Sequence, residues 1–201
     1  MGMERSLVVA ITGASGSIYG VRFLESILEH YDRIYLTVSE NARSVIRIEL
    51  GIDVPADTVD TRALLGRYHE KIEICSPCDL TAPPASGSVS SEGMVIIPCS
   101  MGTAGRIASG VSNDLTTRAA DVCLKERRKL ILVVRETPLN LIHLRNLTTL
   151  AEAGATILPA SPALYTKPKT IEDMVEFVVA RVMQQLGLKH PRAPEWQGIE
   201  G

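Results

Sequence analysis

The sequence predicts an α/β protein: a Rossmann-like or flavodoxin-like three-layer sandwich in which helices cover both faces of a parallel β-sheet. Segments rich in Val, Ile and Leu alternate with segments of helical periodicity along the whole chain. The Val, Ile and Leu segments are apolar at nearly every position, as are strands that are buried on both faces. Short turns rich in Gly and Ser follow several of them, at the edge where such sheets bind ligands.

The strand-like segments are 7–11, 33–38, 94–98, 130–134 and 155–158. Helical periodicity predicts helices near 17–30, 40–50, 103–109, 113–128, 140–153 and 170–187. The segment 77–93 is a loop dense in Pro, Ser, Gly and Ala, and loops of this length are often functional. We expect one domain over 1–187 and a C-terminal tail, 188–201, whose prolines rule out a regular element.

Composition describes an ordinary globular protein of 201 residues, with 45% hydrophobic and 22% charged side chains. The formal net charge is −2, which argues against nucleic-acid binding. The longest apolar run near the amino end, 7–11, is too short for a signal peptide or a membrane span. We therefore predict a cytoplasmic protein without a membrane partner.

The cysteines do not form a recognisable redox or metal motif. Cys75 and Cys78 have C-x-x-C spacing, but a thioredoxin-type site requires the second cysteine to open a helix, and Pro83 and Pro84 follow closely. Neither a second cysteine pair nor a nearby histidine completes a zinc site. We interpret the cysteines as reduced thiols and predict no metal site.

The first glycine-rich turn follows strand 7–11 and reads Thr-Gly-Ala-Ser-Gly over 12–16. Its G-x-x-G-x-x-x-G spacing differs from the dinucleotide fingerprint, although Glu40, just after Ser39, leaves a dehydrogenase open. The chain contains neither a Walker A lysine nor G-x-S-x-G, which argues against a P-loop NTPase and an α/β-hydrolase.

A carboxylate occupies a position where the helix periodicity calls for a core residue. Ala42, Val45 and Ile46 form an apolar stripe, and Glu49 continues it. Desolvation would raise the pKa of this carboxyl and suit it to proton transfer. A glutamate that reaches the rim or pairs with an arginine is the alternative.

Cationic and phenolic side chains gather in the second half of the sequence. Arg118 and Lys125 share a helix face, whereas residues 127–129 are expected to be a solvated helix end. Other candidates are Arg135, Glu136, Tyr165 and Arg181. This set exceeds what one flavin or nucleotide phosphate needs and suggests a second, phosphate-bearing substrate.

Five collinear motifs together resemble the UbiX-type flavin prenyltransferases, over about residue 5 to Trp196. They are 12–16 (TGASG), 82–88 (APPASGS), 98–103 (PCSMGT), 119–128 (AADVCLKERR) and 135–138 (RETP). The resemblance implies a homododecamer in which dimethylallyl phosphate alkylates reduced FMN at N5 and C6 without a metal. It also implies that 1–187 is a single flavoprotein domain and that the tail 188–201 packs at an oligomer interface. The product would be the prenylated FMN used by UbiD-type decarboxylases.

The resemblance also implies residue roles. FMN would contact Gly13, Ala14, Ser15, Ser39, Ser100, Met101, Gly102, Thr103 and Arg135. The prenyl phosphate would be held by Arg118, Lys125, Glu136, Tyr165 and Arg181, some of them from a neighbouring subunit. Catalysis would involve Ser15 and Glu49 near flavin N5, together with Lys125 and Glu136, and Trp196 would help to close the isoprenoid pocket.

One position departs from the family: Leu80 stands where well-known members carry a tryptophan. This difference leaves open the shape of the prenyl pocket and whether the preferred donor is a monophosphate or a diphosphate. Two other functions remain open. An FMN-dependent cysteine-type decarboxylase would share the fold, but its characteristic His and Met-Asn motifs have no counterpart in this sequence. A non-catalytic flavin-binding subunit would need neither Glu49 nor the set formed by Lys125, Tyr165 and Arg181.

Overall fold

The computed structural model describes residues 4–55 and 61–190. These residues form a six-stranded parallel sheet in the order β3-β2-β1-β4-β5-β6. The strands are β1 (Ser6–Ile11), β2 (Arg33–Val38), β3 (Ile72–Ile74), β4 (Gly93–Cys99), β5 (Lys129–Val134) and β6 (Thr156–Pro159). This is the doubly wound order of a Rossmann-type sheet, so the predicted fold class is confirmed, and the chain changes direction between β1 and β4.

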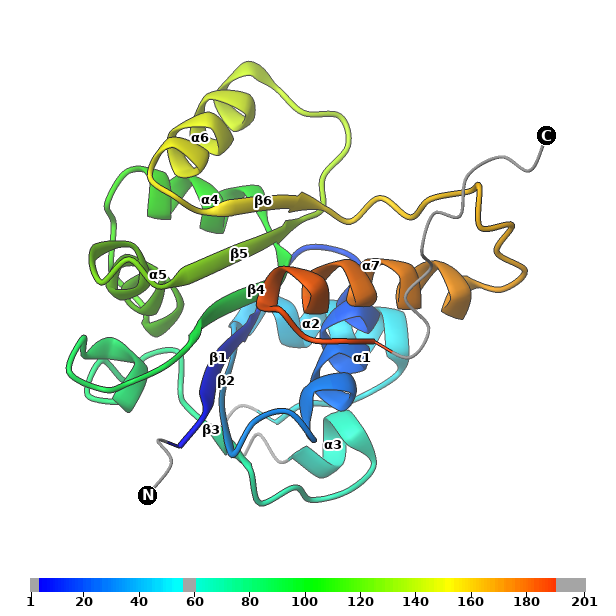
Figure 1. Cartoon of the computed structure of the whole chain (residues 1–201), viewed down its shortest axis with the longest axis horizontal. Helices are drawn as coiled ribbons and strands as arrows, with labels where there is room; N and C mark the ends of the chain where they lie inside the picture. Colours follow the sequence, from blue (N-terminus) through cyan, green and yellow to red (C-terminus); the bar gives the residue numbers. More distant parts are fainter. Residues whose placement is uncertain (1–3, 56–60, 191–201) are drawn as a thin grey trace.

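Helices cover both faces of the sheet (Figure 1). One face carries α1 (Ser17–Ile27), α2 (Glu40–Leu50), α3 (Thr61–Leu65) and α7 (Ile171–Leu186). The other face carries α4 (Met101–Ala108), α5 (Leu115–Lys125) and α6 (Leu141–Glu152). Alternate side chains of β1 enter the two cores: Leu7, Val9 and Ile11 pack under α1 and α7, whereas Val8 and Ala10 pack under α4 and α5.

The differences from the predicted elements are local. Strand β3, helix α3 and the 3-10 turn η1 (Pro83–Ala85) were not predicted, because three to five residues are too few to display a period. Helix α4 begins two residues earlier than expected, since Ser100 caps it. Helix α5 ends at Lys125 rather than near 128, because the chain turns there into a left-handed residue, Arg127.

None of the helices in the described part of the chain is long and apolar enough to cross a membrane. Trp196 and the predicted tail beyond residue 190 lie outside the described residues.

Candidate active site

Four turns meet at the carboxyl edge of the sheet, where β1, β2, β4 and β5 end. The amide of Ser39 donates to the carbonyl of Ile11 (3.0 Å), which ties the second turn to the first. The Thr12 hydroxyl donates to the carbonyl of Pro98 (2.8 Å) and accepts from the amide of Ser100 (2.9 Å). Because these bonds cross neighbouring strands, the turns form one continuous rim.

This rim contains all the residues that the family resemblance assigns to FMN. They are Gly13, Ala14 and Ser15 after β1, Ser39 after β2, Ser100, Met101, Gly102 and Thr103 after β4, and Arg135 after β5. The amide of Arg135 also points to the carbonyl of Cys99, at 3.4 Å. Sequence reasoning did not single out Thr12, whose hydroxyl joins two of the turns; its place next to Gly13 was the available signal.

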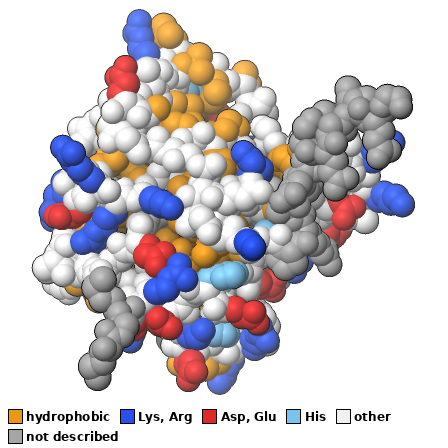
Figure 2. All heavy atoms as spheres, viewed as in Figure 1, with side chains coloured by type: hydrophobic (Ala, Val, Ile, Leu, Met, Phe, Trp, Pro, Cys, Tyr) orange, Lys and Arg blue, Asp and Glu red, His pale blue; other side chains and the backbone are white. Residues whose placement is uncertain are grey.

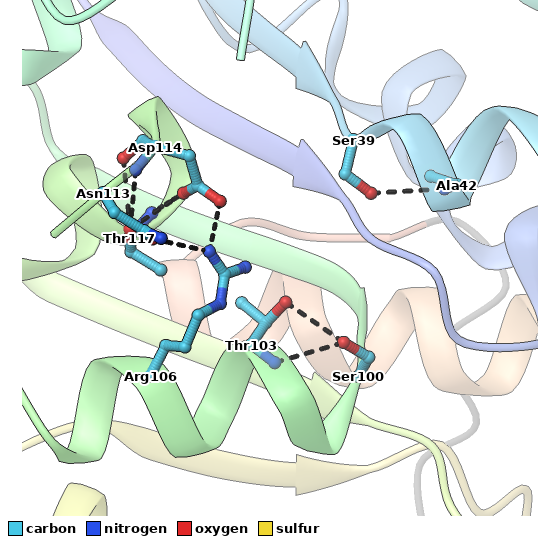
Figure 3. A network of polar contacts seen from close by, with 8 residues as sticks. All are labelled: Ser39, Ala42, Ser100, Thr103, Arg106, Asn113, Asp114 and Thr117. Atoms are coloured by element: carbon cyan, nitrogen blue, oxygen red, sulfur yellow. Dashed lines mark hydrogen bonds and ion pairs between the residues drawn. The ribbon is translucent and has the colours of Figure 1, made fainter. Parts of the chain in front are cut away.

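Two serines cap the helices that open at this rim (Figure 3). The Ser39 hydroxyl accepts from the amide of Ala42 at the start of α2 (3.2 Å), and the Ser100 hydroxyl accepts from the amide of Thr103 at the start of α4 (3.2 Å). The Ser100 hydroxyl also contacts that of Thr103 (3.1 Å). Both helix dipoles therefore present their positive ends at the same edge, which favours an anionic group there.

The turn after β1 depends on small residues. Gly16 has a left-handed backbone (φ 98°), a conformation that L side chains rarely adopt. Gly13 lies so close to α2 that an added Cβ would come within 2.5 Å of Asn41 Cβ. The glycines thus allow the first turn to pack directly against the first turn of α2.

Glu49 binds the start of α1. Its carboxylate accepts hydrogen bonds from the amides of Gly16 (3.0 Å) and Ser17 (2.8 Å) and from the Ser17 hydroxyl (2.6 Å). Gly16 has no side chain with which to cap the helix, so a residue of α2 supplies the cap.

The expected direction of the Glu49 pKa was wrong. Burial does act to raise this pKa, but hydrogen bonds from Ser15, Ser17 and Gly16 outweigh burial and lower the pKa from its ordinary value. Glu49 is also exposed at the end of its stripe rather than packed in the core. The carboxylate is therefore ionised at neutral pH and acts as a fixed acceptor.

Helices α4 and α5 are joined at one end of the second helical layer. Asp114 caps α5 by accepting from the amide of Thr117 (2.8 Å), and the Arg106 guanidinium of α4 pairs with the Asp114 carboxylate (Figure 3). Burial acts to raise the pKa of Asp114, but the hydrogen bonds from Thr117 and Arg106 outweigh burial, so the net effect is a pKa below the ordinary value. This pairing fixes the position of α5, which carries the basic residues.

Arg118 and Lys125 both reach the segment formed by η1 and the loop that leads from it to β4. Arg118 Nε donates to the carbonyl of Ala85 (3.0 Å), and its Nη1 pairs with Asp121 (2.8 Å). Lys125 pairs with Glu126 beside Gly87. The two predicted phosphate-binding cations therefore lie along one loop.

The interpretation of residues 127–129 as solvated was wrong for Arg128, whose guanidinium donates to the carbonyls of Gly87 (2.6 Å) and Val89 (2.7 Å). Lys129 is exposed, but it opens β5 rather than ending the helix, and its Nζ donates to the carbonyl of Gln185 (3.1 Å). Arg127 is exposed, as expected.

The remaining predicted donor-binding residues lie elsewhere in the chain. Tyr165, 53% exposed, follows β6 and packs edge-on against Phe177 of α7, and Arg181 donates to Gln184 on the exposed side of α7 (2.6 Å). Helices α5 and α7 cover opposite faces of the sheet. A single chain therefore does not bring Lys125 and Arg181 together.

Glu136 is exposed just after Arg135, and its carboxylate accepts from the amide of Thr137 (3.0 Å). It stands at the end of β5, beside the rim residues rather than beside Lys125. Burial raises the pKa of the nearby Tyr19 phenol, and the charge of Arg135 opposes that rise. The Arg135 guanidinium thus contributes positive potential to the rim.

Cys75 and Cys78 form no disulfide, and burial raises the pKa of the Cys75 thiol to about 12. A nucleophilic thiolate is therefore not available at Cys75. Within the described residues, no three His, Cys, Asp or Glu side chains gather as metal ligands would.

Comparison with known proteins gives the family. The model of the Flavoprotein family matches residues 1–183. Flavin prenyltransferase UbiX of Alkalihalophilus pseudofirmus is 44% identical over 96% of this chain and 97% of its own length, and that of Pseudomonas aeruginosa is 43% identical over 97% and 95%. The chain belongs to the UbiX flavin prenyltransferases. It is accordingly a transferase of the flavoprotein class.

Solved structures of this family superpose over nearly the whole chain. AnUbiX (PadA1), crystallised with FMN and dimethylallyl pyrophosphate, has a TM-score of 0.87 and 40% identity, with 98% of this chain and 100% of that chain covered. The alternative of a cysteine-type decarboxylase is not favoured. The FMN-dependent cysteine decarboxylase TvaF is only 17% identical with a TM-score of 0.56, over 78% of this chain and 90% of that chain, and so shares the fold alone.

Proposed function

We propose that this flavin prenyltransferase joins the dimethylallyl group of dimethylallyl phosphate to N5 and C6 of reduced FMN. The observation that carries this proposal is the 44% identity to a flavin prenyltransferase along nearly all of both chains. When bound, reduced FMN supplies the nucleophilic atoms. The product would serve UbiD-type decarboxylases, because prenylated FMN is their cofactor.

The rim suits FMN by its donors and its open space. Ser39 accepts a hydrogen bond from Ala42, so its own hydroxyl proton remains for a phosphate oxygen. A Cβ added to Gly102 would meet nothing within 4 Å, so a planar ring can approach the backbone at the start of α4. FMN is therefore assigned to Gly13, Ala14, Ser15, Ser39, Ser100, Met101, Gly102, Thr103 and Arg135.

Positive side chains would draw the phosphate from the allylic carbon. Cleavage of that C–O bond leaves a phosphate anion, which charged donors stabilise more strongly as its charge develops. We assign this role to the cations Arg118, Lys125 and Arg181 and to the neutral phenol donor of Tyr165, with Glu136 reaching the donor from the end of β5. The charge of the three cations would take the place of a metal ion.

Glu49 and Ser15 would align the proton transfer near flavin N5. With its lowered pKa, Glu49 stays ionised and accepts from the Ser15 hydroxyl, which fixes the direction of that hydroxyl. The departing phosphate would then take the proton. Glu49 is thus proposed as the acceptor that orients Ser15 rather than as a protonated acid.

A second copy of the chain would complete the donor site. Lys125 and Arg181 lie on helices that cover opposite faces of one sheet, so we propose that they meet across a subunit interface. Helix α6 offers an apolar surface for assembly: Leu141 is 60% and Ile142 67% exposed, and apolar side chains gather over α6 in Figure 2.

The proposed assembly is a homododecamer. An FMN-dependent Ubix-like decarboxylase from Escherichia coli O157:H7 is described as dodecameric, and it matches with 41% identity and a TM-score of 0.86 over 96% of this chain and 100% of its own. We propose that the domain 1–187 forms each subunit, and that the tail 188–201 packs at the interface and places Trp196 over the isoprenoid.

The cytoplasm is the proposed compartment, since all four cysteines are free, including the exposed Cys78.

The test is to incubate the protein anaerobically with reduced FMN and dimethylallyl phosphate and to measure the flavin mass. A gain of one C5 unit is expected, and samples without donor or without protein are the controls. An unchanged flavin mass in FMN-loaded protein would overturn the proposal. A parallel sample with a cysteine-ended peptide tests decarboxylation, where release of CO2 would instead favour the alternative.

A further inference from the structure

The segment 83–92, formed by η1 and the loop that leads to β4, is held by three side chains from α5 and its end. Arg118 binds the carbonyl of Ala85, Lys125 lies beside Gly87, and Arg128 binds the carbonyls of Gly87 and Val89. Two of these side chains are proposed ligands of the donor phosphate. Arg128 has no role in the proposed function.

Arg128 makes the most extensive contact with this loop. Its two terminal nitrogens donate to Gly87 (2.6 Å) and Val89 (2.7 Å), and Nη1 also reaches the Ser91 hydroxyl (3.4 Å). The two carbonyls belong to a turn in which the amide of Val89 bonds to the carbonyl of Ser86 (3.3 Å). The planar fork of a guanidinium matches two carbonyls at once, which an ammonium cannot do.

The end of α5 is shaped to aim Arg128 at the loop. The amide of Arg128 donates to the carbonyl of Cys123 (2.8 Å) and that of Arg127 to Leu124 (3.1 Å), which is the Schellman arrangement. The position that glycine usually takes in this arrangement is Arg127, with φ 55°. A left-handed conformation costs an L residue free energy, so the turn is retained by contacts on either side of it, among them those of Arg128.

Gly87 connects this contact to Lys125. A Cβ on Gly87 would lie 2.7 Å from Lys125 Nζ and would also collide with the Glu126 carboxylate. The paired ends of Glu126 and Lys125 therefore occupy the space left by the missing side chain. Arg128 holds the carbonyl of the same residue, so Arg128 and the Lys125–Glu126 pair meet the chain at one point, Gly87.

We propose that Arg128 is a positioning residue for the prenyl donor: it fixes the turn at Gly87 so that Lys125 is held where it can bind the donor phosphate. This inference rests on the proposed function. It extends that function by a residue that touches neither substrate and acts only through the loop.

The test compares Arg128→Lys with the wild type in donor kinetics, FMN binding and thermal unfolding. Arg128→Lys keeps the charge but loses the fork, so we expect the KM for dimethylallyl phosphate to rise about 10-fold, as loss of a charge-assisted hydrogen bond does. The affinity for FMN should stay within about twofold, because the rim is bonded independently of this loop. Hydrogen exchange of the amides at 87–91 should accelerate.

Two further variants complete the design. Arg127→Lys changes an exposed neighbour while keeping its charge and should leave the donor KM unchanged. Gly87→Ala displaces the Lys125 ammonium while Arg128 remains, and it should reproduce the higher donor KM even if Arg128→Lys fails to fold. The atoms that its Cβ would meet are the ends of flexible side chains, so this variant is expected to fold.

The outcomes separate the two proposals. A wild type that prenylates FMN, with Arg128→Lys at the wild-type donor KM, overturns this inference and leaves the proposed function in place. The same holds if Arg128→Lys lowers the melting temperature or kcat alone, or if Gly87→Ala has the wild-type donor KM. A wild type that leaves the flavin mass unchanged overturns the proposed function and this inference together.

Discussion

The carboxylate of Glu49, in the last turn of α2, accepts a 2.6 Å hydrogen bond from the hydroxyl of Ser17, in the first turn of α1. Two helices are thereby joined at the rim where Ser15 is proposed to face the flavin. Since Gly16 offers α1 no side-chain cap, Glu49 caps this helix in addition to its proposed role in orienting Ser15.

Replacing Glu49 by Gln should slow prenyl transfer while FMN stays bound. The amide places an N–H group opposite the amide of Gly16 or Ser17, so one cap bond is lost and the Ser15 hydroxyl loses its fixed acceptor. We expect kcat to fall about 100-fold and the free energy of unfolding to fall by about 1 kcal/mol. Single-turnover kinetics and FMN titration measure this; Glu40→Gln, at the other end of α2, is the control. A normal kcat for Glu49→Gln would contradict the assigned role.

The same carboxylate predicts a pH dependence of stability. A carboxyl whose pKa is lowered by folding contributes stability above its unfolded value, ordinarily 4.5, and loses that contribution as the pH falls through the folded value. The difference in unfolding free energy between wild type and Glu49→Gln should therefore be constant near neutral pH and shrink below about pH 4.5. Urea unfolding at several pH values measures it. A difference that grows with acidity would show that the pKa is raised instead.

The sequence predicted the rim well and Glu49 only in part. Residues such as Ser39 and Ser100 stand directly after apolar strands. Because the carboxyl ends of parallel strands share one edge of the sheet, the strand pattern alone predicted that these residues lie at that edge. The Glu49 pKa required knowing which groups face the carboxylate. Those are the amides of Gly16 and Ser17, more than 30 residues away, and no periodicity within α2 reveals them.

The donor residues show a different limit. Arg118 and Lys125 were predicted together because they share one helix face, and both do reach the same loop. The position of Arg181 depended on which face of the sheet α7 covers, a choice that helical periodicity leaves open. Arg128 was assigned to solvent because the left-handed turn at Arg127, which redirects the chain, has no glycine to signal it.

Arg181→Ala should weaken donor binding without affecting the fold. Arg181 is exposed, and its guanidinium donates to the side chain of Gln184, one turn along α7. We expect the KM for dimethylallyl phosphate to rise about 10-fold, as loss of a charged phosphate contact does. The melting temperature and the affinity for FMN should not change, and Arg67→Ala, which removes an exposed arginine between α3 and β3, is the control. An unchanged KM would remove Arg181 from the site.

The thiols should differ sharply in reactivity. Burial raises the pKa of Cys75, Cys99 and Cys123 to about 12 each, whereas Cys78 is exposed. Iodoacetamide at pH 8 should therefore alkylate Cys78 alone in the folded protein, and all four thiols after denaturation. Peptide mass spectrometry identifies the modified positions. Alkylation of Cys75 at a rate similar to that of Cys78 would contradict the packing around β3.

A charge on the outer face of α6 should break the proposed assembly and, with it, the activity. Ile142 is 67% exposed and its neighbour Leu141 is 60% exposed, so neither side chain contributes much to the stability of a single chain. Ile142→Glu should leave the folded subunit intact but place an unpaired carboxylate in an apolar interface, which is costly to bury. Light scattering after size exclusion should show smaller particles, and prenyl transfer should fall with particle size if Lys125 and Arg181 meet across subunits. Ile142→Leu keeps the surface apolar and should assemble as the wild type does. Full-size particles of Ile142→Glu would exclude α6 from the interface, whereas small particles with full activity would show that one chain completes the donor site.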